Sequence, residues 1–165
     1  MSMFCYQCEQ TSQGTGCTSS GVCGKDPKTA ALQDLLMDVC KKIAVKAHTG
    51  SRTREADLFV MEALFTTVTN VNFDADNIAD MIRRGAELLD DWTPAGDLDG
   101  LVAQGEAAGI ESRKQALGDD ITGLQELILY GLKGTAAYAD HAYVLGKEDD
   151  GVFAFFHEAL ALLTK

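Results

Sequence analysis

Proline is scarce in this sequence, with only Pro27 and Pro94 among 165 residues, so long stretches are free to form helices. No run approaches the roughly 18–20 apolar residues that a membrane-spanning helix needs. The first residues also lack the basic region followed by an apolar region that marks a signal peptide. We therefore expect a protein of the cytoplasm.

Basic residues are few as well. The sequence has 14 Lys and Arg against 25 Asp and Glu, which leaves a formal net charge of −11. Nucleic acids and anionic membranes both select for clustered positive charge, so this balance argues against either as a partner. No phosphate-binding loop, dinucleotide fingerprint or nucleophile elbow is present. Outside the cysteines described below, the sequence offers no complete catalytic constellation.

The remaining composition is ordinary for a folded domain, with 46% apolar and 24% charged residues. A chain of this length buries roughly 70% of the surface that its unfolded state exposes. It therefore needs neither disulfides nor metal to form a core. Length alone predicts one domain or two small ones.

The distribution of cysteine is the unusual feature. Four of the five cysteines lie in the first 23 residues, as Cys5, Cys8, Cys17 and Cys23, with the spacing C-x2-C-x8-C-x5-C. The fifth, Cys40, lies in an apolar helical run, where a free cysteine usually acts as a small buried apolar residue. We exclude Cys40 from any ligand set.

Four interpretations of the cysteine segment compete. A disulfide framework fits poorly with a reducing compartment and an odd cysteine count, and four cysteines in nineteen residues are improbable in a merely disordered tail. Structural zinc sites usually pair two short knuckles, but only Cys5 and Cys8 form one here. An iron–sulfur cluster needs soft thiolates and backbone N–H donors, and four glycines that favour positive φ lie near the later cysteines. These are Gly14, Gly16, Gly21 and Gly24. We favour the cluster, because little else in this segment would organise it.

The rest of the sequence has the 3.6-residue periodicity of helices. Asp26-Pro27 is a typical helix start, Asp74 can cap a later helix, and Gly146 is typical of a helix end. A polar stretch over residues 111–120 is expected to be a connection. The expected helices cover residues 26–50, 54–69, 74–92, 97–108, 120–145 and 151–163.

We therefore predict an all-α chain of about six helices in two small three-helix bundles. Residues 1–25 form a cluster-binding loop, residues 26–93 the first bundle and residues 94–165 the second. Gly131 and Gly134, inside the longest helix, suggest close approach by another helix or by the loop. The three histidines, His48, His141 and His157, are scattered, and surface or core positions suit them better than metal ligation.

The N-terminal motifs resemble the hybrid cluster proteins, also called prismane proteins. The resemblance is carried by FCYQCEQT at residues 4–11, GTGC at 14–17 and GVCGK at 21–25, and it continues through LQDLL at 32–36, TNVNF at 69–73 and YGLKG at 130–134. It also covers AAY at 136–138, HA at 141–142 and VLG at 144–146, and thus nearly the whole chain.

The resemblance implies that Cys5, Cys8, Cys17 and Cys23 ligate a cubane 4Fe–4S cluster, whereas wider spacings in the family hold a 2Fe–2S cluster. It implies a hydroxylamine reductase that converts hydroxylamine to ammonia, and reduction of nitric oxide to nitrous oxide is also attributed to the family. Family members are more than three times longer, with two α/β domains that carry a hybrid Fe–S–O cluster. We therefore expect an excised or truncated domain that transfers electrons from a redox donor protein to those domains and is inactive alone. A zinc-stabilised helical interaction module without a redox role is the alternative.

Overall fold

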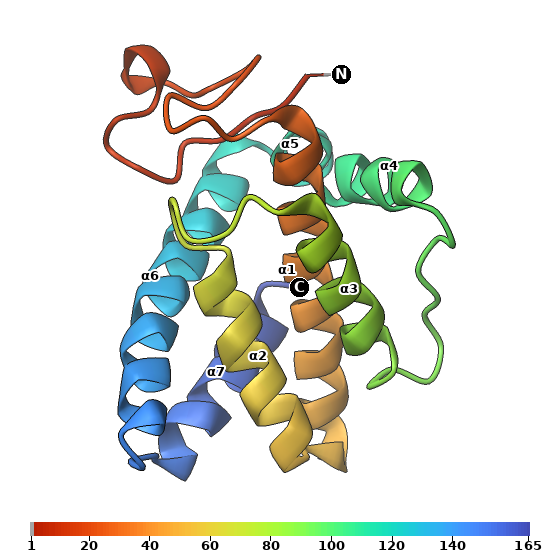
Figure 1. Cartoon of the computed structure of the whole chain (residues 1–165), viewed down its shortest axis with the longest axis vertical. Helices are drawn as coiled ribbons and strands as arrows, with labels where there is room; N and C mark the ends of the chain where they lie inside the picture. Colours follow the sequence, from red (N-terminus) through yellow and green to blue (C-terminus); the bar gives the residue numbers. More distant parts are fainter. Residues whose placement is uncertain (1) are drawn as a thin grey trace.

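The computed structural model describes residues 2–165, with Ser51 as backbone only, and within that range every regular element is a helix (Figure 1). The all-α prediction is thus confirmed. The elements are η1 (Ser12–Gly14), α1 (Pro27–Lys46), η2 (Ala47–Ser51), α2 (Arg54–Thr66), α3 (Ala75–Ala86), α4 (Leu98–Ala108), α5 (Ile110–Leu117), α6 (Asp119–Val144) and α7 (Asp150–Leu162). Among these described helices, none has both the length and the apolar character needed to cross a membrane.

The predicted helix boundaries at three positions are confirmed by their capping geometry. The Asp26 carboxylate accepts a hydrogen bond of 2.6 Å from the backbone N–H of Thr29 at the start of α1. Asp74 caps α3 in the same way. Gly146 follows α6 with φ of 72°, and the adjacent N–H of Lys147 donates back to Ala142, as in a Schellman motif.

The polar stretch that we expected to be a connection is instead largely helix α5. Its own sequence has a weak apolar pattern, and only Ile110 is buried. Contacts from outside the segment support the helix: Arg113 forms an ion pair of 2.6 Å with Glu126 of α6, and the Lys114 ammonium lies 4.2 Å from the centre of the Phe4 ring. Tertiary contacts therefore stabilise a helix that periodicity alone does not predict.

Helix α1 lies at the centre of the molecule and packs against α2, α3, α4 and α7. Its buried residues include Leu32, Leu36 and Val39, which are fully shielded from solvent. Core residues from α1 to α4, α6 and α7 form one continuous apolar cluster, so helices from both predicted bundles contribute to it. The division into bundles at residues 93 and 94 stays a prediction.

The longest helix, α6, has an apolar outer face. Leu124, Leu127 and Tyr138 are each more than 60% exposed. A Cβ atom added at Gly131 or Gly134 would have no neighbour within 4 Å among the described residues. The expected close approach to these two glycines is therefore wrong for this chain, because they lie on the outer side of the helix and not in the core.

Candidate metal centre

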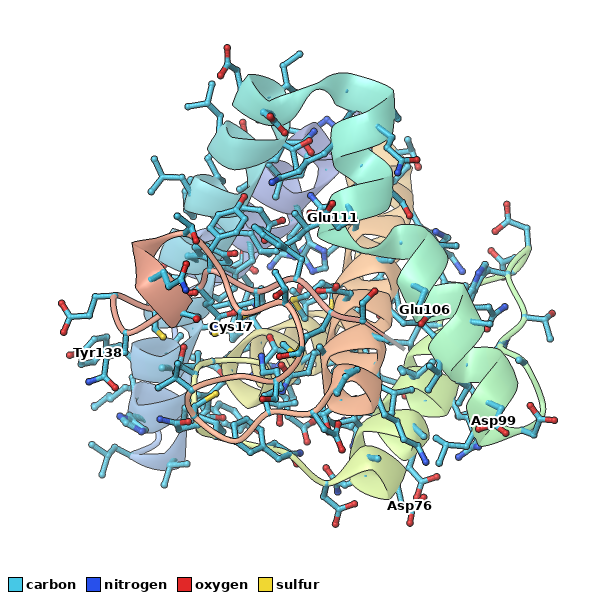
Figure 2. The ribbon with its side chains drawn as sticks, turned by 90° about the horizontal axis from the view of Figure 1, so that it is seen from above. Cys17, Asp76, Asp99, Glu106, Glu111 and Tyr138 are labelled. Carbon is cyan, nitrogen blue, oxygen red and sulfur yellow. The ribbon has the colours of Figure 1, made fainter. Side chains whose placement is uncertain are left out.

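The cysteine loop lies across one end of the helical body, over the N-terminal ends of α1 and α6 (Figure 1). Figure 2, which looks down on that end, shows Cys17 within the loop. Two chain segments of the loop pair locally, because the backbone groups of Cys5 and Cys17 exchange hydrogen bonds of 2.8 and 3.1 Å. This pairing brings the first and third cysteines of the motif together although eleven residues separate them.

All four predicted ligands line one small cavity in the loop. Cys5, Cys8, Cys17 and Cys23 surround it, and all four are free thiols. Cys17 is buried, whereas Cys23 is exposed. Cys40 lies apart from them, fully buried in the main core as part of α1. The structure thus groups the four cysteines of the motif and leaves Cys40 outside the group.

The cavity is small for a metal cluster. Its volume is about 20 Å³, which is roughly the space that one water molecule occupies. Within residues 2–165, no three His, Cys, Asp or Glu side chains are close enough as they stand to hold a metal ion. The four cysteines line this one space and together offer the four thiolates that an iron–sulfur cluster takes.

Donors from the loop point at the sulfur of Cys17. The backbone N–H of Ser12 lies 3.4 Å from Cys17 Sγ, and the Thr11 hydroxyl lies 3.6 Å from it. Hydrogen bonds from the backbone of Ser12 and Val22 lower the pKa of the Cys17 thiol. Because the thiolate is the form that binds metals, this environment favours ligation.

Glycines shape the loop around the later cysteines. Gly14 and Gly24 have φ of 69° and 91°, as predicted for left-handed positions. Gly21 does not adopt a positive φ, so that expectation is wrong for this residue. Its role is close approach instead, because a Cβ atom there would lie 2.9 Å from Cys23 Sγ.

A buried lysine of α6 anchors the loop from below. The Lys133 ammonium donates to the side-chain oxygen of Gln7 at 2.8 Å and to the carbonyl oxygen of Thr67 at 3.3 Å. Gln7 in turn donates to the same Thr67 carbonyl at 3.1 Å. The rings of Tyr6 and Tyr130 add an edge-on contact, with centres 6.0 Å apart. Sequence reasoning missed this anchor, although Lys133 occupies a position on the apolar face of its helix, next to Leu132 and one turn before Ala136.

Two carboxylates share a second small cavity with Lys133 and Cys5. These are Asp34 of α1 and Glu126 of α6. Burial and the nearby charge of Glu126 raise the pKa of Asp34 to about 6. Burial, followed by the positive charge of Lys25, lowers the pKa of Lys133 to about 8. The floor beneath the loop is therefore a set of coupled charges and not an apolar surface.

The raised pKa of Asp34 predicts a pH-dependent stability. The folded chain binds the proton more tightly than the unfolded chain, whose carboxyl has the ordinary pKa of 3.8. The stabilising contribution of Asp34 is thus complete below about pH 4 and is lost as the pH rises through 6. We expect Asp34→Asn to be more stable than the wild type at pH 7.5, with an advantage that shrinks towards pH 4.

Urea unfolding at four pH values between 4.5 and 7.5 measures this difference. Asp38→Asn is the matched control, since Asp38 lies one turn further along α1 and pairs with Lys42 on the surface. The control should lose a little stability and gain none at high pH. An Asp34→Asn variant that is no more stable than the wild type at pH 7.5 would contradict the expectation.

The three histidines lie outside the cysteine cavity. His157 is buried, and its Nε2 atom lies 3.0 Å from a carboxylate oxygen of Asp57, which also binds Arg52. His141 contacts the ring of Phe65 edge-on. The sequence-based interpretation of these residues as core or surface histidines agrees with their places.

Comparisons with known proteins give matches along the whole chain. The family model described as Prismane/CO dehydrogenase family matches residues 3–165. The chain is 44% identical to a hydroxylamine reductase of Rhodospirillum rubrum over 99% of its length, and 45% identical to one of Methanocella arvoryzae over 98%. It is 44% identical to a hydroxylamine reductase of Bacteroides fragilis over its full length. In each case the chain spans only about a third of the relative, between 33% and 35%.

Proposed function

Because the chain belongs to the Prismane/CO dehydrogenase family, we propose that it is the iron–sulfur electron-transfer domain of a longer hydroxylamine reductase. The observation that carries the proposal is the grouping of Cys5, Cys8, Cys17 and Cys23 around one cavity, with backbone N–H donors directed at a sulfur atom. Iron–sulfur proteins in general combine these two features.

The four thiolates would hold a 4Fe–4S cluster, which supplies a carrier for single electrons when bound. Soft thiolate ligands suit iron and sulfide, and four of them complete the set that a cubane cluster takes. The backbone N–H of Ser12 would stabilise negative charge on the Cys17 sulfur. A 2Fe–2S cluster is the less favoured alternative, because the family members that hold one have more widely spaced cysteines.

The residues beneath the loop would influence the reduction potential of the cluster. Lys133 lines the same small cavity as Cys5, and its positive charge favours added negative charge nearby. Glu126 and Asp34 in that cavity act in the opposite sense. Tyr6 of the loop packs its ring edge-on against Tyr130 of α6.

Catalysis would belong to the part of the longer protein that this chain does not include. Relatives named hydroxylamine reductase are about three times as long. We propose that α/β domains in that part carry the hybrid Fe–S–O cluster and reduce hydroxylamine to ammonia, and also nitric oxide to nitrous oxide. The 165-residue chain alone should not turn over hydroxylamine.

A basic redox protein is the donor that the surface would suit. Exposed acidic side chains of α3, α4 and α5 point outward around the end that carries the loop, and Figure 2 labels Asp76, Asp99, Glu106 and Glu111. Such a field would attract a positively charged partner and make the association sensitive to salt. A reducing cytoplasm is the compartment that would keep all the thiols free.

Metal and sulfide analysis of anaerobically prepared protein tests the proposal. We expect a brown protein with iron and acid-labile sulfide each near four per chain, as for a cubane cluster. A colourless protein with one zinc ion would support the alternative, a zinc-stabilised helical interaction module. Near two iron and two sulfide per chain would instead identify the smaller cluster.

A further inference from the structure

The short segment between Cys5 and Cys8 is fixed to the helical body through its two intervening residues. Tyr6 packs its ring against Tyr130 of α6. Gln7 directs its side-chain amide at α6 and at the residues that follow α2. Gln7 also lines the cavity that the four cysteines share. One side chain thus connects the first pair of thiols to two separate parts of the body.

The amide of Gln7 has all its hydrogen-bonding groups in use. Its nitrogen donates to the carbonyl oxygen of Thr67 at 3.1 Å and to the hydroxyl oxygen of Thr69 at 3.0 Å. Its oxygen accepts from the Lys133 ammonium at 2.8 Å. An ammonium only donates and a carbonyl only accepts, so the amide has one orientation that satisfies both neighbours. The side chain of Gln7 is therefore held in a single place.

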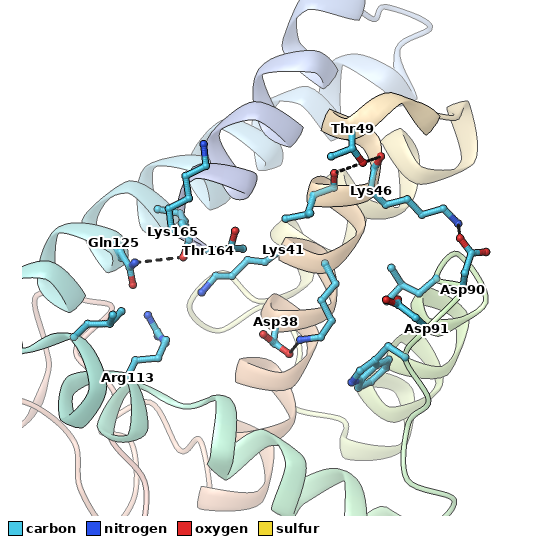
Figure 3. A pocket seen from close by; sticks show the side chains of 16 residues that line it. Asp38, Lys41, Lys46, Thr49, Asp90, Asp91, Arg113, Gln125, Thr164 and Lys165 are labelled. Atoms are coloured by element: carbon cyan, nitrogen blue, oxygen red, sulfur yellow. Dashed lines mark hydrogen bonds and ion pairs between the residues drawn. The ribbon is translucent and has the colours of Figure 1, made fainter.

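Lys133 directs its charge at this amide and not at a carboxylate. For comparison, Lys46 of α1 pairs with Asp90 at 2.7 Å (Figure 3). Lys133 is only 6% exposed, and no carboxylate of the described residues lies within 4.0 Å of its ammonium group. The group contacts the oxygens of Gln7 and Thr67, and Thr67 is the C-cap residue of α2, where carbonyl groups carry partial negative charge. A buried ammonium is costly, and here its hydrogen bonds hold Gln7 against the end of a helix.

The part of the loop that follows Cys8 has no such attachment. Among the described residues, the hydrogen bonds of residues 8–16 all end within the loop itself. Cys5 has a second support, because its backbone pairs with that of Cys17. Cys8 has only the local turn that follows it and the held side chain of Gln7 that precedes it. The place of Cys8 therefore depends most on Gln7.

We propose that Gln7 is a positioning residue for the metal-binding thiolates, and that Lys133 acts on them through Gln7. The inference rests on the proposed function in one respect, since it assumes that the four thiolates bind one metal group. While the amide is held, the segment between Cys5 and Cys8 keeps both thiols on the shared cavity. Without it, Cys8 is free to turn away, and the metal group loses a preorganised pair of ligands.

Cadmium binding to the reduced, metal-free chain of 165 residues tests this role without iron. Cadmium–thiolate bonds absorb in the ultraviolet, so a titration with the cadmium ion measures the affinity of the thiol group. Gln7→Leu keeps most of the side-chain length but removes all three hydrogen bonds. We expect it to bind cadmium about tenfold more weakly or worse, as is typical when a residue that orients a metal ligand is lost. Thr69→Val removes one of the three partners and should weaken binding less.

Gln10→Leu is the matched control. Gln10 lies two residues after Cys8, as Gln7 lies two residues after Cys5, but its side chain is exposed and forms no hydrogen bond with another described residue. The same substitution at this position should leave the cadmium affinity unchanged. A loss in Gln10→Leu as large as that in Gln7→Leu would overturn the proposal, because any change of glutamine in the loop would then have the same effect.

A double variant tests whether Lys133 acts through Gln7. Lys133→Met should weaken cadmium binding when Gln7 is present. It should cause no further loss in the Gln7→Leu background, since both substitutions remove the same attachment. An equal loss in both backgrounds would show that Lys133 acts independently, and would overturn that half of the proposal.

Urea unfolding of the same variants separates positioning from a purely structural role. Gln7 is not part of the apolar core, so Gln7→Leu should keep its fold. Cadmium affinity equal to that of the wild type would overturn the proposal, whatever the change in stability. If Gln7→Leu folds poorly, Thr69→Val provides the test, and wild-type affinity in that variant would have the same consequence.

Iron and sulfide analysis of the wild type decides the proposed function separately. A wild type that carries zinc and no sulfide would refute the iron–sulfur cluster. The cadmium titrations would still show whether Gln7 positions the thiolates, because they need no iron. The two proposals can therefore fail independently of each other.

Discussion

Replacing Cys17 by Ser should abolish the visible absorption of anaerobically prepared protein. Cys17 is the most buried of the four clustered thiols, and backbone hydrogen bonds lower its pKa. A serine hydroxyl is a harder ligand that stays protonated at neutral pH, so it replaces the thiolate poorly. We expect iron and acid-labile sulfide to fall at least tenfold.

Cys40→Ala is the matched control for this experiment. Cys40 lies in the main core, where burial raises the pKa of its thiol well above the usual range. The variant should lose some stability, by the removal of a buried atom, but keep its full iron content. Loss of absorption in Cys40→Ala, or its retention in Cys17→Ser, would contradict the ligand assignment.

The contact between α1 and α4 predicts the largest effect on stability. A Cβ atom at Gly105 would lie 2.1 Å from the backbone oxygen of Ala31 and 2.6 Å from its carbonyl carbon. Helix α1 packs against the core on its other side, and a shift of α4 away from it would pull Leu101 and Val102 out of that core. Gly105→Ala should therefore lower the free energy of unfolding by about 3 kcal/mol or more, measured by urea denaturation.

Gly131→Ala should change the free energy of unfolding in the opposite direction in the same measurement. The added methyl group at residue 131 would have no neighbour within 4 Å among the described residues. Alanine is a better helix former than glycine by about 1 kcal/mol, so this variant should be more stable than the wild type. If Gly105→Ala unfolds at the wild-type urea concentration, α1 and α4 do not approach as closely as described.

The fold was largely predictable because most helices carry their own signals. Asp26 and Asp74 cap helices with a side chain that the sequence displays directly, and the apolar period of α1 is unambiguous. Helix α5 was not predictable, since its support comes from Glu126 and Phe4, which are distant in the chain. The predicted close approach at the glycines of α6 was wrong for a related reason. Apolar residues occur on two faces of that helix, and periodicity alone does not show which face is buried.

The candidate site was likewise predictable from the sequence only in part. The spacing of the four cysteines predicted their grouping, because a loop of small and polar residues can bring them together. Lys133, Gln7 and Asp34 are ordinary polar residues in the sequence, and only their partners in space distinguish them. One feature of the sequence could have identified a buried lysine of this kind. Lys133 and Lys41 each occupy a position that faces the core on an otherwise apolar helix face. A lysine at such a position identifies a charge that the fold must accommodate.

The attachment of the cysteine loop has a consequence for how damage to the domain would divide. The helical body buries a continuous core of its own side chains, and the loop is tied to that body through the hydrogen bond between Gln7 and Lys133. A substitution in the loop would therefore leave the helical core intact, so that loss of iron and loss of the fold can be measured as separate events.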